Sequence, residues 1–367
     1  MKILVLSCNT GQGHNSAANA IIEHFTLKGD ECIPFDALEF LSKKVSEFLC
    51  TWHVRLYRYA PALFDIGYDY SERHPVFAKD APVYTILCSG VKKLEKFVCA
   101  GGFDGIICTH PFASLMVTEM LSRYTHKNLK TAIVSTDYTC SPGVAESNVD
   151  AYFVPHKSLK TEFISGGVDE SKIYPSGIPI KKTFLTRLDK ATAKAKFGIL
   201  PEQKHVLMMC GSIGCGPMAE LVDLLSRRID SDTVLTVICG KNEKLKNRLD
   251  KLEAKNVRAL GYTDEVSLLM DSADIYLTKA GGISTTEACF KGLPMVFIDA
   301  VSGCEAHNRH FFEPIGFGFG PTDDDSTTDV CMNMLFNSKK LEETSKKMRD
   351  EFNLDPCEVI YDFFSNK

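Results

Sequence analysis

Short apolar runs alternate along nearly the whole chain with longer segments in which apolar residues recur every three to four positions. The short runs are rich in β-branched residues and bounded by turn residues, which is typical of buried strands, whereas the longer pattern indicates helices. Strands are predicted at residues 3–7, 32–35, 105–109, 131–136 and 151–154, and then at 206–210, 234–239, 257–260, 275–278 and 295–298. Helices are predicted at residues 14–26, 82–99 and 111–122, and then at 217–228, 243–252, 265–271 and 285–291.

This alternation predicts an α/β fold with two Rossmann-like, doubly wound domains, because strands that alternate with helices form parallel sheets covered on both faces. A turn-rich stretch marks the junction, so we expect an N-terminal domain at 1–182 and a C-terminal domain at 183–345. Residues 346–367, with a helix break near Pro356, could pack back on the first domain. Two such domains facing each other would place their Gly-rich loops around one central cleft.

Residues 40–98 interrupt the alternation, since no strand is evident there. This segment carries nine basic and six acidic side chains in a chain of net charge −5, and it is rich in aromatic residues: Trp52, Tyr57, Tyr59, Phe64, Tyr68 and Tyr70. A basic, aromatic, helical segment favours an anionic membrane surface or an amphiphilic substrate. The alternative is an ordinary insertion whose aromatic side chains pack on the first domain.

Composition narrows the classes of function. The net negative charge argues against nucleic-acid binding, which requires a positive field. The 14 cysteines are scattered without a C-x-x-C pair, which favours reduced thiols in the cytoplasm. The sequence shows neither a signal peptide nor a run of about 20 apolar residues, so we expect a soluble or peripheral protein. No Cys/His cluster suggests a metal, and the acidic residues 323–325 are expected to form a solvated turn.

The first Gly-rich turn, at residues 9–14, follows the first predicted strand and ends in Gly13 and His14. It departs from the dinucleotide fingerprint because Ser16 stands where the third glycine would be. A histidine at the start of a helix is held neutral by the helix dipole, as a general base requires. The alternative is a histidine that bonds to a neighbouring loop.

Two further polar residues follow strands of the first domain. Asp137 comes after the strand at 131–136, and His110 comes after the strand at 105–109. Both lie at the carboxyl edge of the predicted sheet, where ligands bind. Each could point into the cleft, or cap a helix or turn, and we favour the capping role for His110.

The second domain contains two Gly-rich turns. One, at residues 211–216, includes Gly211 and Ser212; glycines there allow phosphate or sugar to approach the backbone, and the lack of a Walker lysine excludes a P-loop NTPase. The other contains Gly281 and Gly282 between a strand and a helix, which is typical of an anion site. Residues 284–287 also match an S-x-x-E capping box, which needs no ligand.

Together these motifs resemble those of a known family. Residues 9–14, followed by Ala17 and Ala18, look like the N-terminal motif of monogalactosyldiacylglycerol synthases and processive diacylglycerol glucosyltransferases. Residues 279–288 resemble the donor-site motif of the same family, glycosyltransferase family 28. The resemblance implies the GT-B fold, metal-independent chemistry, and a nucleotide-sugar held mainly by the C-terminal domain.

The resemblance also implies roles for individual residues. It makes His14 the catalytic base. Asp137 stands in a matching T-D motif, which in the family continues to a histidine and a tryptophan but continues here with neither, over residues 138–143. Cys304 replaces the usual glutamine of a sugar-contacting stretch, which leaves the sugar open. The implied donor-binding residues are Gly13, Gly211 and Ser212; Tyr262 near the uracil; Gly281, Gly282, Ser284 and Thr285 at the diphosphate; Glu287 at the ribose; and Glu305 and Asn308 at the sugar.

We therefore expect an inverting glycosyltransferase that moves a hexose from a UDP-sugar to a lipid such as diacylglycerol. It would need no cofactor or metal and would act peripherally at the cytoplasmic face of the cell membrane. The alternatives are a UDP-sugar epimerase of the same fold, a glycosyltransferase with a polyprenyl-linked acceptor, and a nonenzymatic lipid- or nucleotide-binding module.

Overall fold

The computed structural model describes residues 1–9, 11–45, 47, 61–79, 81–211, 216–252, 254–298 and 303–366, without the side chains of 61–65. Two compact units divide the chain. Unit 1 comprises Met1–Lys182, Ser302–Cys304 and Leu354–Lys367, and unit 2 comprises Thr183–Val301 and Glu305–Asn353.

Unit 1 is built on a six-stranded sheet in the order β2-β1-β3-β4-β5-β6, in which every neighbouring pair is parallel. Its strands are β1 (Lys2–Ser7), β2 (Glu31–Asp36), β3 (Gly105–Cys108), β4 (Lys130–Val134), β5 (Ala151–Val154) and β6 (Ile173–Pro175). Its α-helices are α1 (Gln12–Leu27), α3 (Pro61–Arg73), α4 (Pro82–Cys88), α5 (Val91–Gly101), α6 (Pro111–Arg123), α7 (Lys160–Ser165) and α17 (Pro356–Ser365), and its 3-10 helices are η1 (Ala37–Phe40), η2 (Lys157–Leu159) and η3 (Glu170–Lys172).

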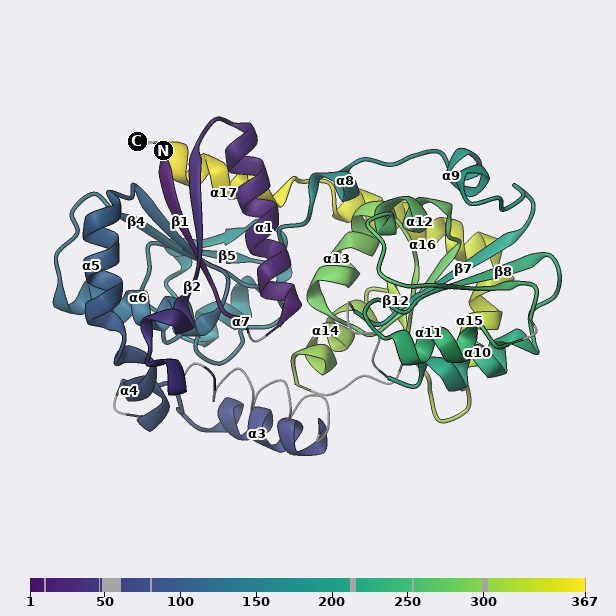
Figure 1. Cartoon of the computed structure of the whole chain (residues 1–367), viewed down its shortest axis with the longest axis horizontal. Coiled ribbons are helices and arrows are strands. Elements are labelled where there is room, and N and C mark those ends of the chain that lie inside the picture. Colours follow the sequence, from purple (N-terminus) through teal and green to yellow (C-terminus); the bar gives the residue numbers. More distant parts are fainter. Residues whose placement is uncertain are drawn as a thin grey trace. The chain divides into compact units, whose positions relative to one another are not determined.

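Unit 2 contains a second parallel sheet, in the order β12-β11-β10-β7-β8-β9. Its strands are β7 (Lys204–Met209), β8 (Thr233–Ile238), β9 (Val257–Leu260), β10 (Ile275–Thr278), β11 (Met295–Phe297) and β12 (Gly318–Phe319). Its helices are α9 (Lys190–Lys196), α10 (Met218–Ser226), α11 (Glu243–Leu249), α12 (Val266–Ser272), α13 (Gly282–Lys291), α14 (Cys304–Phe312), α15 (Thr327–Leu335) and α16 (Ser338–Glu351), with α8 (Lys182–Leu185) at the boundary between the units. The predicted α/β class with two doubly wound domains is confirmed (Figure 1).

The predicted strands all form, and two edge strands add to them. β6 and β12 are only three and two residues long, too short to give a periodic signal. The helix predicted at 82–99 is interrupted between α4 and α5 at Gly90, where an added Cβ would lie 2.9 Å from the Phe40 backbone. Tertiary contact therefore requires glycine at this break.

The C-terminal helix α17 completes the core of unit 1. α17 packs on α1, and the two lie side by side in Figure 1, where α17 is yellow. Its Ile360 and Phe364 join a buried cluster with Ile3 and Phe25, so α17 covers the same face of the sheet as α1. The C-terminal division falls at Leu354, later than the predicted 346, because α16 packs on α13 and α15 of unit 2.

Candidate functional site

The reversal of strand order in unit 1 lies between β1 and β3, since β2 flanks β1 on its other side. In such sheets the loops diverge at this point and leave a crevice at the carboxyl ends of the strands. His14 lies in the first turn of α1 after β1, Thr109 and His110 follow β3, and Thr136 and Asp137 follow β4. The sheet topology thus brings the candidate residues of unit 1 to one edge.

Hydrogen bonds orient His14 and fix its tautomer. Its Nδ1 lies 2.7 Å from the backbone oxygen of Thr109 and 2.9 Å from Oγ1 of Thr136. A carbonyl oxygen can only accept, so Nδ1 carries the proton and Nε2 keeps its lone pair. His14 can therefore both bond to a neighbouring loop and act as a base. The loop contact uses Nδ1, and Nε2 stays basic.

Electrostatics hold His14 neutral. Burial lowers the pKa of His14 below its ordinary value, while the negative charge of Asp137 and the bond to the Thr109 carbonyl act in the opposite direction. Asp137 is half-buried and close enough to act on the imidazole. Gly13, one residue before His14, is a helical residue of α1.

His110 is a helix cap, as favoured from the sequence. Its Nδ1 accepts a hydrogen bond of 3.0 Å from the backbone N–H of Phe112 and thereby caps α6. Its ring also meets that of His14 edge-on, with the ring centroids 4.4 Å apart. His110 therefore forms one wall of the His14 environment while its Nδ1 lone pair is used by the helix.

The reversal of strand order in unit 2 lies between β7 and β10. Gly211 follows β7 with φ +67°, a left-handed conformation that favours glycine. A Cβ at Gly211 would lie 3.4 Å from Cε of Lys279, which follows β10, so the two Gly-rich turns are neighbours. Ser212 lies outside the described residues.

The start of α13 differs from the predicted capping box. The helix begins at Gly282, three residues earlier than predicted, and its N-cap is Gly281, with no side-chain hydrogen bond. Ser284 is therefore inside the first turn, and its hydroxyl donates to the Gly281 carbonyl at 3.2 Å. The capping-box interpretation is wrong, and the first N–H groups of α13 have no side-chain cap, which suits an anion.

The other polar residues of α13 serve different purposes. Thr285 is fully buried, and its hydroxyl lies 2.9 Å from the Gly281 carbonyl oxygen, so its side chain supports the turn from inside. Burial raises the pKa of the Tyr276 phenol of β10, and the charge of Glu287, which is half-buried in the second turn of α13, adds to this.

Helix α14 brings two further predicted residues to the same turn. Asn308 is fully buried, and its Nδ2 donates to the backbone oxygen of Ala280 at 2.9 Å. Glu305 forms an ion pair with Lys279. Sequence reasoning did not select Lys279 as a site residue, although it stands within the quoted motif; its position beside Gly211 and its carboxylate partner appear only in three dimensions.

Tyr262 lies apart from this group. It follows β9, the strand at the opposite edge of the sheet from β12, and its side chain is 65% exposed. Its hydroxyl donates to Asp264 at 3.2 Å. It shares the carboxyl edge of the sheet with the two Gly-rich turns, two strands away from β7.

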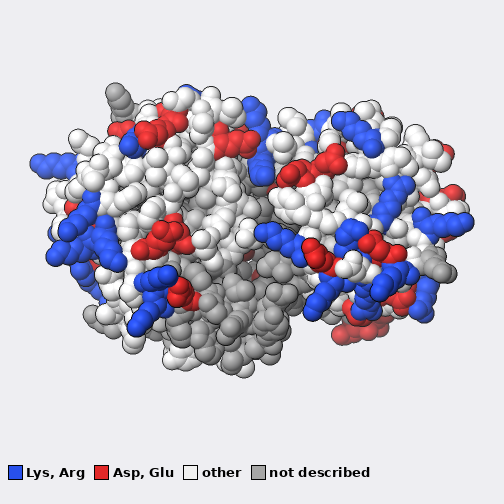
Figure 2. All heavy atoms as spheres, in the orientation of Figure 1, with Lys and Arg blue, Asp and Glu red and all other residues white. Residues whose placement is uncertain are grey.

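The segment at 40–98 exposes apolar and basic side chains where the structure describes it. Ile66 and Tyr70, one turn apart on α3, are 66% and 56% exposed. Lys92, Lys93 and Lys96 of α5 are also exposed, in the region where Figure 2 shows basic side chains gathered on unit 1. Trp52, Tyr57 and Tyr59 and the side chain of Phe64 lie outside the described residues. Among the described residues, no helix is long and apolar enough to cross a membrane.

Unit 1 also contains a cavity of about 680 Å³ away from these residues. It is lined in part by Thr118 and Glu119 in the second half of α6 and by Asn148 and Asp150 just before β5. These positions lie toward the amino ends of the strands, whereas His14 lies at the carboxyl ends. The cavity therefore does not coincide with the predicted site.

Comparison with known proteins identifies both halves of the chain. A family model for monogalactosyldiacylglycerol (MGDG) synthase matches residues 14–180, and a model for the glycosyltransferase family 28 C-terminal domain matches residues 205–311. A processive diacylglycerol β-glucosyltransferase from Bacillus pumilus (strain SAFR-032) is 29% identical over 95% of this chain and 90% of its own. The enzyme of that name from Bacillus subtilis (strain 168) is 27% identical over 98% of this chain and 93% of its own.

Solved structures share the fold at lower identity. Acinetobacter baumannii MurG matches with a TM-score of 0.64 and 11% identity over 100% of this chain and 99% of its own. A UDP-GlcNAc 2-epimerase from Neisseria meningitidis matches with a TM-score of 0.60 and 13% identity over the whole of both chains. These likenesses establish the fold, which glycosyltransferases and epimerases share. Since the family models and the sequence relatives are glycosyltransferases, the chain is a glycosyltransferase with the GT-B fold, whose residues 14–180 match the monogalactosyldiacylglycerol synthase family and whose residues 205–311 match glycosyltransferase family 28.

Proposed function

We propose that this glycosyltransferase moves a hexose from a UDP-sugar to a lipid acceptor such as diacylglycerol, with inversion at the anomeric carbon and without a metal ion. The names of the sequence relatives support the acceptor and the sugar class. The observation that carries the mechanism is the fixed tautomer of His14, whose Nδ1 is bonded to the Thr109 carbonyl and whose Nε2 keeps a lone pair.

In the proposed reaction, Nε2 of His14 removes the proton from the acceptor hydroxyl. The acceptor oxygen attacks the anomeric carbon from the face opposite the leaving group, and the bond between that carbon and the UDP oxygen breaks. UDP departs as an anion, and His14 later returns its proton to solvent. Attack from the opposite face gives inversion.

In the proposed reaction, the start of α13 stabilises the negative charge that develops on UDP. Its N–H groups have no side-chain cap at Gly281, and Lys279 lies beside the turn at Gly211. Fixed dipoles and a cation aimed at developing charge stabilise a transition state as a bound metal would. Gly282 and Ser284 would contact the diphosphate through their backbone, and Glu287 would bond the ribose.

Membrane access is proposed for the described part of residues 40–98. The exposed Ile66 and Tyr70 offer apolar surface to lipid, and Lys92, Lys93 and Lys96 offer charge to anionic headgroups. We propose that the enzyme binds the cytoplasmic face of the membrane peripherally in this way. A polyprenyl-linked acceptor would use the same surface.

Product analysis tests the proposal. The protein is incubated with a panel of UDP-sugars and vesicles with or without diacylglycerol, in the presence of a chelator, and the products are identified by mass spectrometry and their anomeric configuration by NMR. We expect a glycolipid of inverted configuration only when diacylglycerol is present. An epimerised sugar formed without lipid would instead establish the epimerase, and UDP binding without turnover of any donor would establish a binding module.

A further inference from the structure

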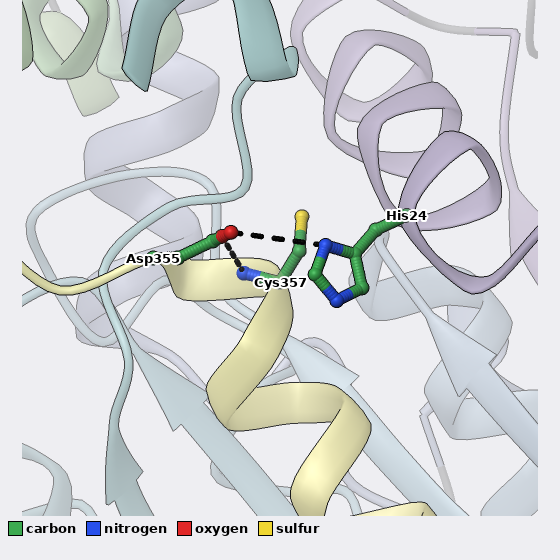
Figure 3. A group of neighbouring side chains, drawn as sticks. All are labelled: His24, Asp355 and Cys357. Carbon is green, nitrogen blue, oxygen red and sulfur yellow. Dashed lines mark hydrogen bonds and ion pairs between the residues drawn. The ribbon is translucent and has the colours of Figure 1, made fainter. Parts of the chain in front are cut away.

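Three metal-ligating side chains meet where α17 packs on α1. His24 comes from the last two turns of α1, while Asp355 caps the N-terminus of α17 and Cys357 lies in its first turn. Figure 3 shows the thiol of Cys357 between the carboxylate of Asp355 and the ring of His24. Nδ1 of His24 lies 3.7 Å from Oδ2 of Asp355, and one ligand atom from each of the three residues lies within 4.8 Å of the other two.

We propose that His24, Asp355 and Cys357 bind a divalent transition-metal ion, with zinc the best fit, that fastens α17 to α1. Imidazole nitrogen, carboxylate oxygen and thiolate sulfur are the donor atoms that zinc takes in proteins. Two ligand atoms each about 2.0 Å from a tetrahedral ion are about 3.3 Å apart. The observed separation of 3.7 Å between Nδ1 and Oδ2 needs to close by only a few tenths of an ångström.

The helix cap orients two of the three ligands. Oδ1 of Asp355 accepts a hydrogen bond of 2.9 Å from the backbone N–H of Cys357. This bond leaves Oδ2 directed at His24 and holds the backbone of Cys357 in place. A single capping interaction therefore sets both α17 ligands before any ion arrives.

The third ligand has the supporting carboxylate that metal-bound histidines usually have. Nε2 of His24 lies 3.0 Å from Oε2 of Glu358, and Nζ of Lys28 lies 2.8 Å from Oε1 of the same carboxylate. Nε2 makes no hydrogen bond of regular geometry, but the negative charge of Glu358 beside it favours the proton on Nε2. The Nδ1 lone pair then faces Asp355 and Cys357, which is the tautomer that a metal ligand requires.

Charge and proton balance are consistent with a doubly charged ion. The carboxylate of Asp355 and the thiolate of Cys357 together neutralise the ion, and the thiol proton leaves to solvent when the ion binds. Binding must displace that proton, so the affinity for zinc should increase with pH.

The proposed site is separate from the transfer chemistry. His24 lies in the second half of α1, whereas His14 lies in its first turn, so the ion would stabilise unit 1 rather than act on substrate. The inference does not depend on the proposed reaction, and its tests need no activity measurement.

Cobalt binding tests the site directly. Purified, reduced, metal-free protein is titrated with Co²⁺, which gives a near-ultraviolet charge-transfer band when a thiolate is a ligand. We expect one equivalent of Co²⁺ to produce this band, Zn²⁺ to abolish it, and Zn²⁺ to raise the melting temperature. A folded wild-type protein that shows no such band would overturn the proposal.

Matched variants locate the ion. Cys357→Ser removes the thiolate, and Asp355→Asn keeps a good helix cap while removing the carboxylate; both should lose the band. Glu358→Gln should weaken binding by about 10–100-fold, as loss of a supporting carboxylate does. Circular dichroism verifies that each variant is folded.

The control is a second group of possible ligands, Glu95, Cys99 and His126, in which Cys99 is exposed. Cys99→Ser should keep the cobalt band and the zinc-dependent rise in melting temperature. A band that survives Cys357→Ser or disappears in Cys99→Ser would assign the ion elsewhere and disprove the proposal.

Discussion

At the residue scale, His14 is distinguished from its neighbour His110 by which nitrogen each commits to the backbone. His14 donates from Nδ1 to the Thr109 carbonyl, whereas His110 accepts at Nδ1 from the Phe112 N–H. The two imidazoles are 4.4 Å apart and share one environment. Substitution of each in turn can therefore separate a base from a cap.

We predict that His14→Gln lowers kcat about 10²–10⁴-fold, the usual contribution of a general base. Gln can still donate to the Thr109 carbonyl, so the fold should persist. His110→Asn keeps an acceptor for the Phe112 N–H and should retain most of the activity. Steady-state kinetics with a UDP-sugar and lipid vesicles would measure both; equal losses in the two variants would contradict the assignment to His14.

The pH dependence distinguishes His14 from Asp137. Since burial lowers the pKa of His14, kcat/KM should be level near pH 7 and fall only below the ordinary histidine value of about 6.5. The Asp137 charge raises the pKa of His14, so Asp137→Asn should move this acidic limb to lower pH while sparing most of kcat. Loss of kcat by the full factor expected for a base, without movement of the limb, would make Asp137 the base instead.

At the scale of elements, α13 begins without a side-chain cap, and its N-cap glycine has a backbone conformation that other residues can also adopt. Gly281 has φ −77° and ψ 136°, and an added Cβ would come no closer than 3.5 Å to Ser284 Oγ. A side chain is thus tolerated sterically. Because glycine has no side chain to accept hydrogen bonds from the first N–H groups, it makes the helix less stable than a capping residue would. Functional sites often have such a loss of stability.

We predict opposite effects of Gly281→Asp on stability and on donor binding. Aspartate should cap α13 and stabilise unit 2 by a few tenths of a kcal/mol relative to glycine, and by about 0.5–2 kcal/mol relative to alanine at the same position. Its charge would occupy the place proposed for the diphosphate, so KM for the UDP-sugar should rise at least about tenfold. Gly281→Ala, which adds a Cβ without a cap or charge, is the control; tighter donor binding in the aspartate variant would refute the diphosphate site.

A second prediction at this scale concerns the buried His205 of β7. Its ring nitrogens lie 2.9 Å from Thr236 Oγ1 and 3.0 Å from Ser272 Oγ, and burial lowers its pKa to about 4. The unfolded chain binds a proton near pH 6.5, so the stability of unit 2 should be full above that pH. It should fall by about 3 kcal/mol as the pH is lowered to 4.

Hydrogen exchange of peptides from β7 and β8, corrected for intrinsic rates, would measure this loss. His205→Gln cannot titrate and should show a flatter profile over the same range. An identical profile in the two proteins would assign the acid sensitivity to other groups.

The sequence predicted the elements whose signals are local. Central strands such as β5 and β10 are buried along their whole length and come from short apolar runs, so their bounds were predicted to the residue. The break at Gly90 depends on contact with Phe40, and the start of α13 depends on hydrogen bonds back to Gly281. Neither the break nor the helix start can be predicted from the periodicity of apolar residues.

The candidate site, like the fold, could be predicted from the sequence only where its signals are local. Glycines and polar residues directly after strands identified the carboxyl edges of both sheets, because parallel strands place their ends together. The pairing of Lys279 with Glu305, and of His24 with α17, joins residues far apart in the sequence. Such pairs require the fold before they can be found.

At the scale of the whole molecule, unit 1 depends on residues that follow unit 2 in the chain. Phe364 of α17 is 5% exposed, and its ring lies against Gly105 of β3, where an added Cβ would be only 2.5 Å away. We predict that Phe364→Ala destabilises unit 1 by about 3–5 kcal/mol, the usual cost of removing a buried phenylalanine. Unit 2 should be unaffected.

Hydrogen exchange resolved by peptide would compare β3 with β7 in this variant. Phe336→Ala, at a position that is 57% exposed, is the matched control and should change little in either unit. Equal loss of protection in β3 and β7 would show that the two units unfold together.

The docking of α17 on α1 also sets an order of events during synthesis. The strands of unit 1 emerge from the ribosome first, yet the helix that covers Ile3, Phe25 and Phe153 emerges only after all of unit 2 has been translated. Until then, that apolar face is open to chaperones and to other nascent chains. A fragment ending near Lys182 should therefore be aggregation-prone, and separately supplied α17 peptide should improve its solubility.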